Sequence, residues 1–335
     1  MNTLIVNQQQ VERLLPMAEC IGVMEDVLTA LARDDCLLPL RSIMWLERDV
    51  AALGLMPSAW RSARIIGLKA VTYFPGNEGT ALDSHQGAVM LFDGNRGNLL
   101  AVIDATSITA IRTAAVSGVA TKVLARNESK NLAIIGSGVQ ARMHLRAMLL
   151  CRRIARVRVC SKSHGQAQRF ADEMSRECAA PLDAVASPEE AVEGADVICT
   201  TTSSRRPVLM GTWLRPGTHV NAVGSSTSSA RELDGPAVKM SRLFVDRRES
   251  AAREAGDFVI ARQEGLVNDD HIIAEIGEVL DRSSQGRRSP DEITLFKSVG
   301  LAVEDLAAGW HVYKKALQQD GATIINFGGA RHAAP

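Results

Sequence analysis

The first strong pattern of apolar and polar positions lies in residues 16–32 and has the period of an α-helix. Apolar side chains recur there at i, i+3, i+4 and i+7, at Met24, Val27, Leu28 and Leu31. The acidic residues Glu19 and Asp26 lie on the opposite side of the same helix. This spacing predicts an amphipathic helix with one buried face.

The pattern changes between Arg41 and about Ile103 to short runs rich in β-branched and large apolar residues. The clearest runs are Ile65–Val71, Ala88–Phe92 and Leu99–Ile103. Glycine and asparagine interrupt the pattern at Pro75–Asn77 and Asp93–Gly97. Several strands joined by tight turns predict a mostly antiparallel sheet in this part of the chain.

Strands and helices alternate in the remainder of the chain. A helix of small residues is predicted over 108–124, and the short apolar strand Leu132–Ile135 then ends directly on Gly136. Further strands are predicted at Val157–Cys160, Val197–Thr200, His219–Val223 and Leu243–Asp246. Residues 291–318 are predicted to be helical and long enough to return to the first domain. This alternation indicates an α/β fold with a Rossmann-type, doubly wound parallel sheet.

Length and composition agree with two folded domains. The chain has 335 residues, of which 46% are hydrophobic and 23% charged, so it can bury a large core. Lys plus Arg equals Asp plus Glu at 38 each, which leaves no bulk field to attract nucleic acid or an anionic membrane. The first residues lack a signal-peptide pattern, and no stretch approaches the roughly 18 apolar residues of a membrane span. We therefore expect a cytoplasmic protein that binds neither nucleic acid nor membrane.

The six cysteines give no sign of a metal site or a disulfide framework. They lie far apart in the sequence and form no C-x-x-C pair. We expect them to be buried or half-buried free thiols, and we expect no metal.

A glycine-rich loop follows the predicted strand that ends at Ile135. Its residues are Gly136, Ser137, Gly138, Val139, Gln140 and Ala141. Gly136 permits a tight turn, Gly138 lets a phosphate approach the backbone, and Ala141 allows close helix packing. Because a helix begins near Val139, backbone N–H groups and the positive end of its dipole would face a pyrophosphate. The loop therefore predicts a dinucleotide cofactor.

The end of the following strand indicates which dinucleotide is bound. NAD enzymes place an acidic residue there, about 20 positions after the loop, to hydrogen-bond the ribose 2′-hydroxyl. This chain has no Asp or Glu in residues 160–164, where Ser161 and Lys162 instead offer donors and a positive charge to a 2′-phosphate. We expect NADP(H) to be preferred, with NAD(H) as the alternative.

Short motifs occur in a fixed order along the chain: Ser84–Gly87, Ile108–Ala115, Gly136–Ala141, Asn221–Gly224, Arg231–Asp234, Phe296–Gly300 and Glu304–Asp305. This ordered set resembles the ornithine cyclodeaminase/mu-crystallin family, above all its ketimine reductase (mu-crystallin-like) members. The resemblance covers nearly the whole chain. It implies a homodimer in which an α+β domain, residues 1–115 and 306–335, binds substrate and dimerises. Residues 116–305 would form the Rossmann NAD(P)-binding domain.

The resemblance also implies that Arg41, Lys69 and Arg112 bind the carboxylate of a small amino acid or imino acid. Guanidinium groups and an ammonium suit that role, since they donate charge-assisted hydrogen bonds to both carboxylate oxygens. Lys69 lies in an otherwise apolar predicted strand. A buried charge without a partner costs several kcal/mol, so Lys69 requires a counter-ion or a ligand.

Two departures from the cyclodeaminase pattern indicate which reaction is catalysed. Cyclodeaminases of this family carry an aspartate where this chain has Ser226, and a glutamate where it has Gly54. The ketimine reductase branch resembles this chain in both replacements. Without a positioned general base, deamination would lose about 10²- to 10⁴-fold in rate. We therefore expect NADPH-dependent reduction of 1-pyrroline-2-carboxylate or 1-piperideine-2-carboxylate to the cyclic L-amino acid.

Further residues are candidates for this site. Lys69 would also donate a proton or hydrogen bond near the imine, His85 would supply a proton near the nicotinamide, and Ser226 would contact substrate through water. The residues expected to line the cofactor cleft are Thr113, Thr200, Thr202, Val223 and Ser298.

Three alternative functions remain open at the level of sequence. The first is an ornithine cyclodeaminase or an amino-acid dehydrogenase acting on alanine or arginine. The second is a protein that holds NADPH without turnover. The third is an opine-type condensation of an amino acid with a keto acid. Assays with the respective substrates distinguish them.

Overall fold

The computed structural model describes residues 2–47, 50–77, 80–319 and 322–328. The chain forms two compact units: Met1–Arg112 with Leu301–Pro335, and Thr113–Gly300. The chain therefore passes between the units twice, at residues 112–113 and 300–301. Of the ranges expected for the first domain, residues 1, 48–49, 78–79, 320–321 and 329–335 lie outside the described residues.

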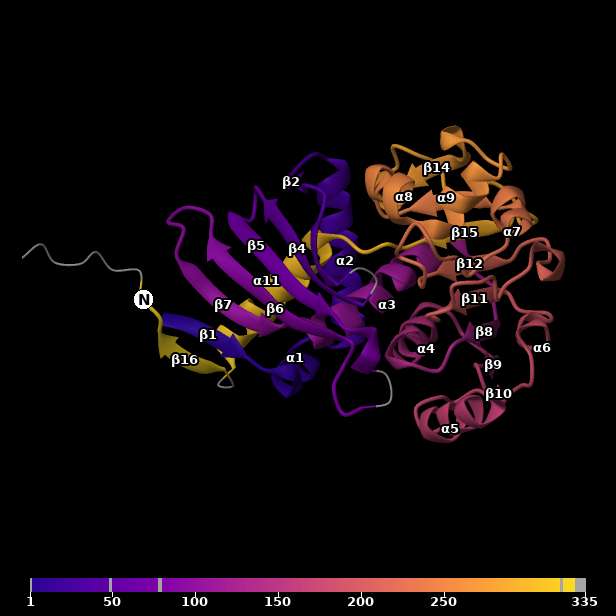
Figure 1. Cartoon of the computed structure of the whole chain (residues 1–335), viewed down its shortest axis with the longest axis horizontal. Coiled ribbons are helices and arrows are strands. Elements are labelled where there is room, and N and C mark those ends of the chain that lie inside the picture. Colours follow the sequence, from indigo (N-terminus) through magenta and orange to yellow (C-terminus); the bar gives the residue numbers. More distant parts are fainter. Residues whose placement is uncertain (1, 48–49, 78–79, 320–321, 329–335) are drawn as a thin grey trace, which may run out of the picture. The chain divides into compact units, whose positions relative to one another are not determined.

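The first unit is built on a large, mostly antiparallel sheet (Figure 1). Its strands are β1 (Asn2–Val6), β2 (Cys36–Leu37), β3 (Ser42–Glu47), β4 (Ala51–Trp60), β5 (Ile65–Tyr73), β6 (His85–Asp93), β7 (Leu99–Asp104) and β16 (Thr323–Asn326). Their order is β16-β1-β7-β6-β5-β4-β2, and β3 pairs with β4. The antiparallel sheet predicted from the sequence is confirmed, with one parallel pair between β1 and β7.

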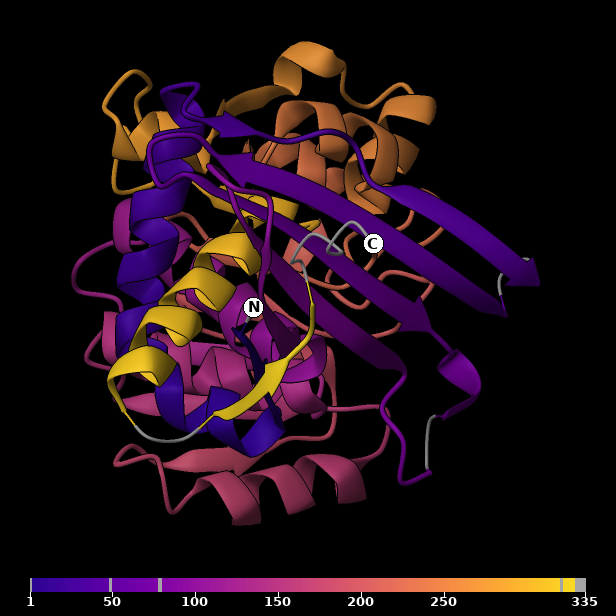
Figure 2. The same ribbon diagram turned by 90° about the vertical axis from the view of Figure 1, so that its left-hand side faces the viewer.

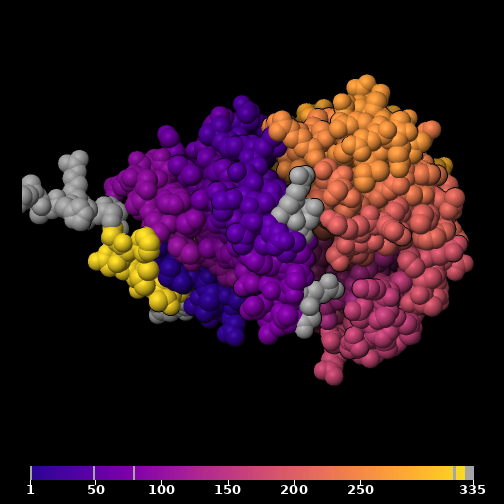
Figure 3. Space-filling view, viewed as in Figure 1, coloured from indigo at the N-terminus to yellow at the C-terminus, as the bar shows by residue number. Residues whose placement is uncertain are grey.

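Helices cover one face of this sheet. They are α1 (Gln8–Leu14), α2 (Met17–Ala32), the first part of α3 (Ala105–Leu124) and α11 (Ala302–Gln318); η1 (Pro75–Asn77) is a short turn. Figure 2 shows α2 and α11 together on the same side of the strands. The predicted apolar face of α2, with Met24, Val27, Leu28 and Leu31, is buried. In the space-filling view, residues of the strands themselves form the opposite surface (Figure 3).

The second unit contains a fully parallel sheet. Its strands are β8 (Asn131–Ile135), β9 (Arg156–Cys160), β10 (Leu182–Ala184), β11 (Val197–Thr200), β12 (His219–Ala222), β13 (Arg242–Val245), β14 (Ile272–Glu275) and β15 (Thr294–Lys297). The order is β10-β9-β8-β11-β12-β15-β13-β14. The strand order runs outward from β8 through β9 on one side and from β11 through β12 on the other, so the predicted doubly wound sheet is confirmed. Ligands of such sheets bind at the carboxyl ends beside this reversal.

Short helices and turns connect these strands. They are the rest of α3, α4 (Val139–Cys151), α5 (His164–Met174), α6 (Pro188–Val192), α7 (Gly235–Met240), α8 (Arg248–Glu254), α9 (Gly256–Gln263), α10 (Ile276–Leu280), η2 (Gly211–Trp213) and η3 (Asp269–His271). An apolar core between helices and sheet includes Ile198, Val220, Leu243, Phe258 and Leu295.

The prediction of a continuous helix over 291–318 was wrong at its start. Residues 294–297 form β15, which lies inside the sheet between β12 and β13, and α11 begins only at Ala302. All four residues of β15 are buried. In a buried segment of four residues the apolar pattern does not distinguish a strand from a helix. The charged residue Lys297 also made a buried strand harder to recognise.

All six cysteines are free thiols, as predicted. Five are buried, and Cys151 is half-buried. Within the described ranges, no helix combines the length and the apolar character needed to cross a membrane.

Candidate active site

Lys69 is the centre of a buried ionic cluster in the first unit. Alternation along β5 turns Ile65, Gly67 and Lys69 to the same buried face. The Lys69 ammonium lies 2.6 Å from Oδ2 of Asp305, and it donates a hydrogen bond of 3.4 Å to Oγ1 of Thr109. Lys69 is 4% exposed and Asp305 is fully buried. Asp305 is thus the counter-ion that the sequence required for Lys69.

Arg112, on α3, binds the same carboxylate from another direction. Its Nε donates to Oδ1 of Asp305 at 2.9 Å, and its Nη1 donates to Oε2 of Glu304 at 2.6 Å. Glu304 and Asp305 lie in the first turn of α11, and both are fully buried. Asp305 therefore bridges Lys69 and Arg112. We call Lys69, Arg112, Glu304 and Asp305 the ionic cluster.

The surroundings adjust the protonation of this cluster. Burial lowers the pKa of Lys69 to about 8; Asp305 opposes that change, and the positive charges of Arg112 and Arg41 add to it. Burial acts to raise the pKa of Asp305, but Arg112 and Lys69 outweigh it and hold that pKa below its ordinary value. The Lys69 ammonium is therefore stable at neutral pH but titrates close to it. Arg41 is half-buried just before β3, and its positive charge contributes to lowering the pKa of Lys69.

His85 begins β6 and lies opposite Tyr73 of β5, with the two ring centroids 4.9 Å apart. The Ser84 hydroxyl is 3.1 Å from its Nδ1. Loss of solvent lowers the pKa of His85, Asp83 opposes the shift, and Lys69 adds to it. The imidazole is therefore neutral at pH 7 and still partly accessible.

The glycine-rich loop of the second unit has the geometry that a pyrophosphate requires. Gly136 has a φ of +121°, and a Cβ added there would lie 2.7 Å from the carbonyl oxygen of Thr201. Gly138 immediately precedes α4, and a Cβ added to it would meet no heavy atom within 4 Å. Ala141 is fully buried under the helix. The helix start is thus open to a ligand, and the residues present fit a dinucleotide. Ser137, Val139 and Gln140 belong to the same loop and first turn.

Ser161 and Lys162 follow β9, beside this loop. The Ser161 hydroxyl lies 2.7 Å from the hydroxyl of Ser137. Lys162 is exposed, and Ser163 caps the start of α5 through its hydroxyl. A serine bound to the phosphate loop and an exposed ammonium thus lie together at the end of β9.

Most of the residues expected to line the cofactor cleft lie at or just after the carboxyl ends of β11, β12 and β15, and Thr113 lies on α3. Oγ1 of Thr200 donates to Oε2 of Glu232 at 2.7 Å, and Thr200 is fully buried. Thr202 donates to Oε1 of Glu232 through its backbone N–H and its hydroxyl, both at 2.6 Å. Thr113 and Ser298 are also buried, and Val223 is half-buried. Both threonine hydroxyls are thus engaged by one carboxylate.

Gly54 and Ser226 are the two positions at which the resemblance implies carboxylates in cyclodeaminases. Gly54 lies in β4, and a Cβ added there would contact Val71 at an ordinary 3.6 Å. Ser226 is exposed on the loop after β12. A side chain therefore fits at position 54.

Several residues of these arrangements were not assigned by the sequence. Glu304 and Asp305 belong to a motif named in the sequence analysis, but no function was predicted for them. Glu232, Asp257 and Lys297 form a second buried group, for which no function was predicted either. The detectable signal was acidic or basic residues within apolar segments, as in Asp305 before Leu306 or Lys297 after Phe296.

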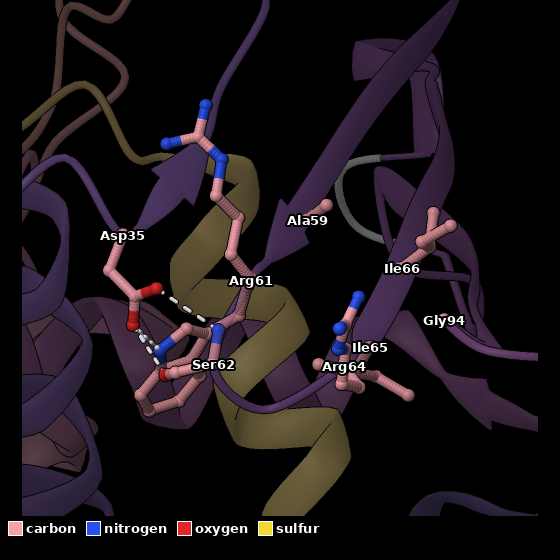
Figure 4. A pocket seen from close by; sticks show the side chains of 9 residues that line it. Asp35, Ala59, Arg61, Ser62, Arg64, Ile65, Ile66 and Gly94 are labelled. Atoms are coloured by element: carbon pink, nitrogen blue, oxygen red, sulfur yellow. Dashed lines mark hydrogen bonds between the residues drawn. The ribbon is translucent and has the colours of Figure 1, made fainter.

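A pocket of about 570 Å³ lies elsewhere in the first unit, at the turn between β4 and β5 (Figure 4). Its lining residues are Asp35, Ala59, Trp60, Arg61, Ser62, Arg64, Ile65, Ile66 and Gly94. Asp35 accepts hydrogen bonds from the backbone N–H and hydroxyl of Ser62 and from the Trp60 indole, which lower its pKa. These contacts stabilise the turn, and none of the predicted site residues lines the pocket.

Comparison with known proteins identifies relatives that match most of the chain. The chain is 39% identical over 275 residues to ketimine reductase mu-crystallin of Mus musculus, covering 82% of this chain and 84% of that protein. The structure of Thermococcus litoralis Δ1-pyrroline-2-carboxylate reductase, in complex with NADH and L-proline, superposes with a TM-score of 0.93 at 39% identity. That match covers 96% of this chain and 99% of the other. An archaeal alanine dehydrogenase dimer with bound NAD has a TM-score of 0.92 at 33% identity, covering 98% and 100%.

The family assignment rests on a family model that matches most of the sequence. The model that matches is that of the ornithine cyclodeaminase/mu-crystallin family, over residues 1–320. The ordered motifs, the two units and the relatives all agree with it. The chain therefore belongs to the ornithine cyclodeaminase/mu-crystallin family.

Proposed function

We propose that this protein is an NAD(P)-dependent oxidoreductase that reduces the C=N bond of cyclic ketimine carboxylates, with NADPH as the preferred cofactor. The substrates are 1-pyrroline-2-carboxylate and 1-piperideine-2-carboxylate, and the products are the cyclic L-amino acids. The observation that carries this proposal is the ionic cluster, in which Asp305 holds Lys69 and Arg112 side by side. The first unit would bind substrate, and the second would bind the cofactor.

The cluster suits a carboxylate held next to an imine. Arg112 and Arg41 provide guanidinium donors, which pair with carboxylates in two parallel hydrogen bonds. Lys69 adds a compact ammonium whose pKa of about 8 allows it to hold or release a proton near neutral pH. A ketimine that arrives protonated at nitrogen needs orientation more than it needs a general base. Ser226 would contact substrate through water, and His85 would supply a proton from the minor fraction of its imidazole that is protonated.

The phosphate loop supports binding of a nicotinamide dinucleotide, which supplies the hydride when bound. Residues 136–141 would hold the pyrophosphate, and Ser161 with Lys162 would bind the 2′-phosphate of NADPH. The relatives with solved structures contain NADH or NAD. The preference for NADPH therefore rests on Ser161 and Lys162 alone, and both cofactors belong in the assay.

The absence of two carboxylates favours reduction over cyclodeamination. Position 54 is glycine and position 226 is serine, so neither supplies the general base that loss of ammonia needs.

The test is NADPH oxidation with each cyclic imine, run beside NADH and beside L-ornithine with NAD. Imine-dependent oxidation without ammonia release from ornithine supports the proposal, and ammonia release from ornithine contradicts it. Lys69→Met should lower imine turnover about 100-fold or more, since it removes a charge-assisted contact and leaves Arg112 as the only cation paired with Asp305. Lys239→Met, an exposed lysine of α7, is the matched control and should leave turnover unchanged.

An amino-acid dehydrogenase is the second candidate, because the archaeal alanine dehydrogenase shares the fold over nearly the whole chain. The same cluster would then bind the carboxylate of an open-chain amino acid. NAD(P) reduction with L-alanine faster than with L-proline would favour this candidate. Cofactor binding without turnover of any imine or amino acid would favour a binding protein.

The proposal includes a homodimer formed through the exposed strand β3 of the first sheet. All six residues of β3 are exposed, and four of them are large and apolar: Ile43, Met44, Trp45 and Leu46. Contiguous exposed apolar surface of this kind marks an interaction site. Replacing Trp45 and Leu46 by glutamate should yield monomers in sedimentation velocity. Leu150→Glu, at an exposed leucine of α4, is the control and should leave the dimer intact.

A further inference from the structure

The Arg231–Asp234 segment carries a buried carboxylate with no role in the function proposed above. The Glu232 side chain is fully buried. It accepts three hydrogen bonds, all from the residues at the end of β11: the Thr200 hydroxyl at 2.7 Å, and the Thr202 backbone N–H and hydroxyl at 2.6 Å each. Burial raises the pKa of Glu232, while Lys297 and the threonine donors oppose that rise. Glu232 thus fixes both the backbone and the side chains of this strand end.

Two further buried charges hold Glu232 in place. Oδ1 of Asp257 accepts the backbone N–H groups of Glu232 at 2.7 Å and Leu233 at 2.8 Å. Lys297, the last residue of β15, lies 3.0 Å from Oδ2 of Asp257 and donates to the carbonyl oxygen of Gly224. We call Glu232, Asp257 and Lys297 the second network. It links the carboxyl ends of β11, β12 and β15 through charged hydrogen bonds.

Gly224 shows how closely the loops after β11 and β12 pack over Glu232. A Cβ added to Gly224 would lie 2.3 Å from the carbonyl oxygen of Thr202 and 2.5 Å from Cδ of Glu232. No side chain fits there without moving backbone. The two loops and the Glu232 carboxylate therefore form one packed layer, which shifts only if these hydrogen bonds break.

The position of this layer in the sheet indicates which half of a dinucleotide it would face. In doubly wound sheets each half of the sheet binds one nucleotide, on either side of the reversal of strand order. The phosphate loop follows β8, and Ser161 follows β9, so these strands face the adenosine half. The layer over Glu232 belongs to β11, β12 and β15, on the other side of the reversal.

We propose that Glu232 is a positioning residue for the nicotinamide half of the cofactor site. It acts through the Thr200–Thr202 segment and the Gly224 loop and does not touch the reacting atoms. The inference rests on the proposed function to the extent that the cofactor is a nicotinamide dinucleotide. It assigns a task to the Thr200 hydroxyl different from lining the cleft.

The test compares NADPH with 2′-phospho-ADP-ribose, which lacks only the nicotinamide ring, in calorimetric titrations of Glu232→Gln. The variant keeps the size of the side chain but replaces one acceptor oxygen by an amide donor, which opposes the donors of Thr200 and Thr202. Loss of hydrogen bonds to a charged group should raise the dissociation constant of NADPH about tenfold or more. Binding of 2′-phospho-ADP-ribose should stay within about twofold, since the phosphate loop is untouched. If the wild type prefers NADH, then NADH and ADP-ribose replace this pair.

Glu264→Gln is the matched control, because Glu264 is a partly exposed carboxylate that pairs with Arg231, next to Glu232. It should leave both dissociation constants unchanged. Equal weakening of both ligands by Glu232→Gln would mean general damage to the unit and would overturn the inference, as would unchanged NADPH binding. If Glu232→Gln does not fold, Thr200→Val removes one of the three hydrogen bonds with little change of shape, and the same difference between ligands is expected at smaller size.

The outcome is separable from that of the proposed function. A wild-type protein that binds NADPH but reduces no imine would contradict the proposed reaction and leave this comparison fully interpretable.

Discussion

The Nζ atom of Lys69 and Oδ2 of Asp305 lie 2.6 Å apart inside the first unit, in a place where neither side chain reaches bulk water. Asp305 simultaneously accepts from Nε of Arg112. A single carboxylate therefore sets the positions of two of the three cations that we propose to bind substrate. The charges of this cluster depend on one another.

Asp305→Asn should be costly both to stability and to turnover. The variant removes the negative charge between Lys69 and Arg112, and breaking a buried ion pair typically costs about 3–5 kcal/mol. Urea unfolding measures the first effect, and imine-dependent NADPH oxidation the second. Asp26→Asn, at an exposed position of α2, provides the control for both measurements. A variant Asp305→Asn as stable as wild type would show that the cluster is not ionic as described.

Imine reduction should lose efficiency in alkaline solution. The ammonium form of Lys69 is present below its pKa of about 8 and disappears above it, so kcat/KM should fall about tenfold per pH unit beyond that value. In Lys69→Arg the guanidinium stays charged, and the descending limb should move to higher pH. The same limb in both proteins would assign it to the substrate imine instead.

The protein should lose stability in mild acid because of two buried neutral histidines. Burial lowers the pKa of His144 to about 4 and that of His219 to about 3, from an ordinary 6.5. Unfolding lets both take up protons below pH 6.5, so their contribution is intact above that pH. It declines as the pH falls toward the two folded-state values, by about 2 kcal/mol for each histidine at pH 5.

Urea unfolding between pH 7 and pH 5 measures this decline. His144→Gln should make this loss of unfolding free energy smaller by the contribution of one histidine. His164→Gln, at an exposed residue of α5, should leave the loss unchanged. An identical decline in the wild type and in His144→Gln would refute the assignment to His144.

Cofactor preference should follow the residues after β9. Replacing Ser161 by Asp and Lys162 by Ser places a carboxylate where NAD enzymes hydrogen-bond the ribose hydroxyl and removes the positive charge. The ratio of kcat/KM for NADPH over that for NADH should fall at least about tenfold, because one lost charged contact is worth that much. Ser163, which caps α5, is left in place to preserve the helix. An unchanged ratio would remove the basis for an NADPH preference.

Local patterns predicted most of the fold. The apolar period of α2, the alternation in β5 and the strand–glycine–helix sequence at residues 135–139 each depend on neighbouring residues, and all three appear in the structure. The need of Lys69 for a counter-ion was also predictable, since it follows from the cost of burying a charge.

The identity of that counter-ion was not predictable from local pattern. Asp305 reaches Lys69 only because α11 packs on β5, and nothing near either residue in the sequence encodes that contact. The start of α11 was misplaced for a related reason. Residues Thr294–Lys297 form a strand because they pair with β12 and β13, and their own sequence does not distinguish a strand from a helix. The second network escaped detection likewise, since Glu232, Asp257 and Lys297 meet only through tertiary structure.

The most direct test of the central claim, that the ionic cluster binds the substrate carboxylate, is steady-state NADPH oxidation with 1-piperideine-2-carboxylate and with 1-piperideine, which lacks the carboxylate. We expect kcat/KM to be about 1,000-fold or more lower for 1-piperideine, since contacts to a fully desolvated charge are worth several kcal/mol. Arg41→Met should lower kcat/KM for 1-piperideine-2-carboxylate and leave that for 1-piperideine unchanged, so the ratio of the two values should become smaller. Comparable efficiencies for the two imines would contradict the account.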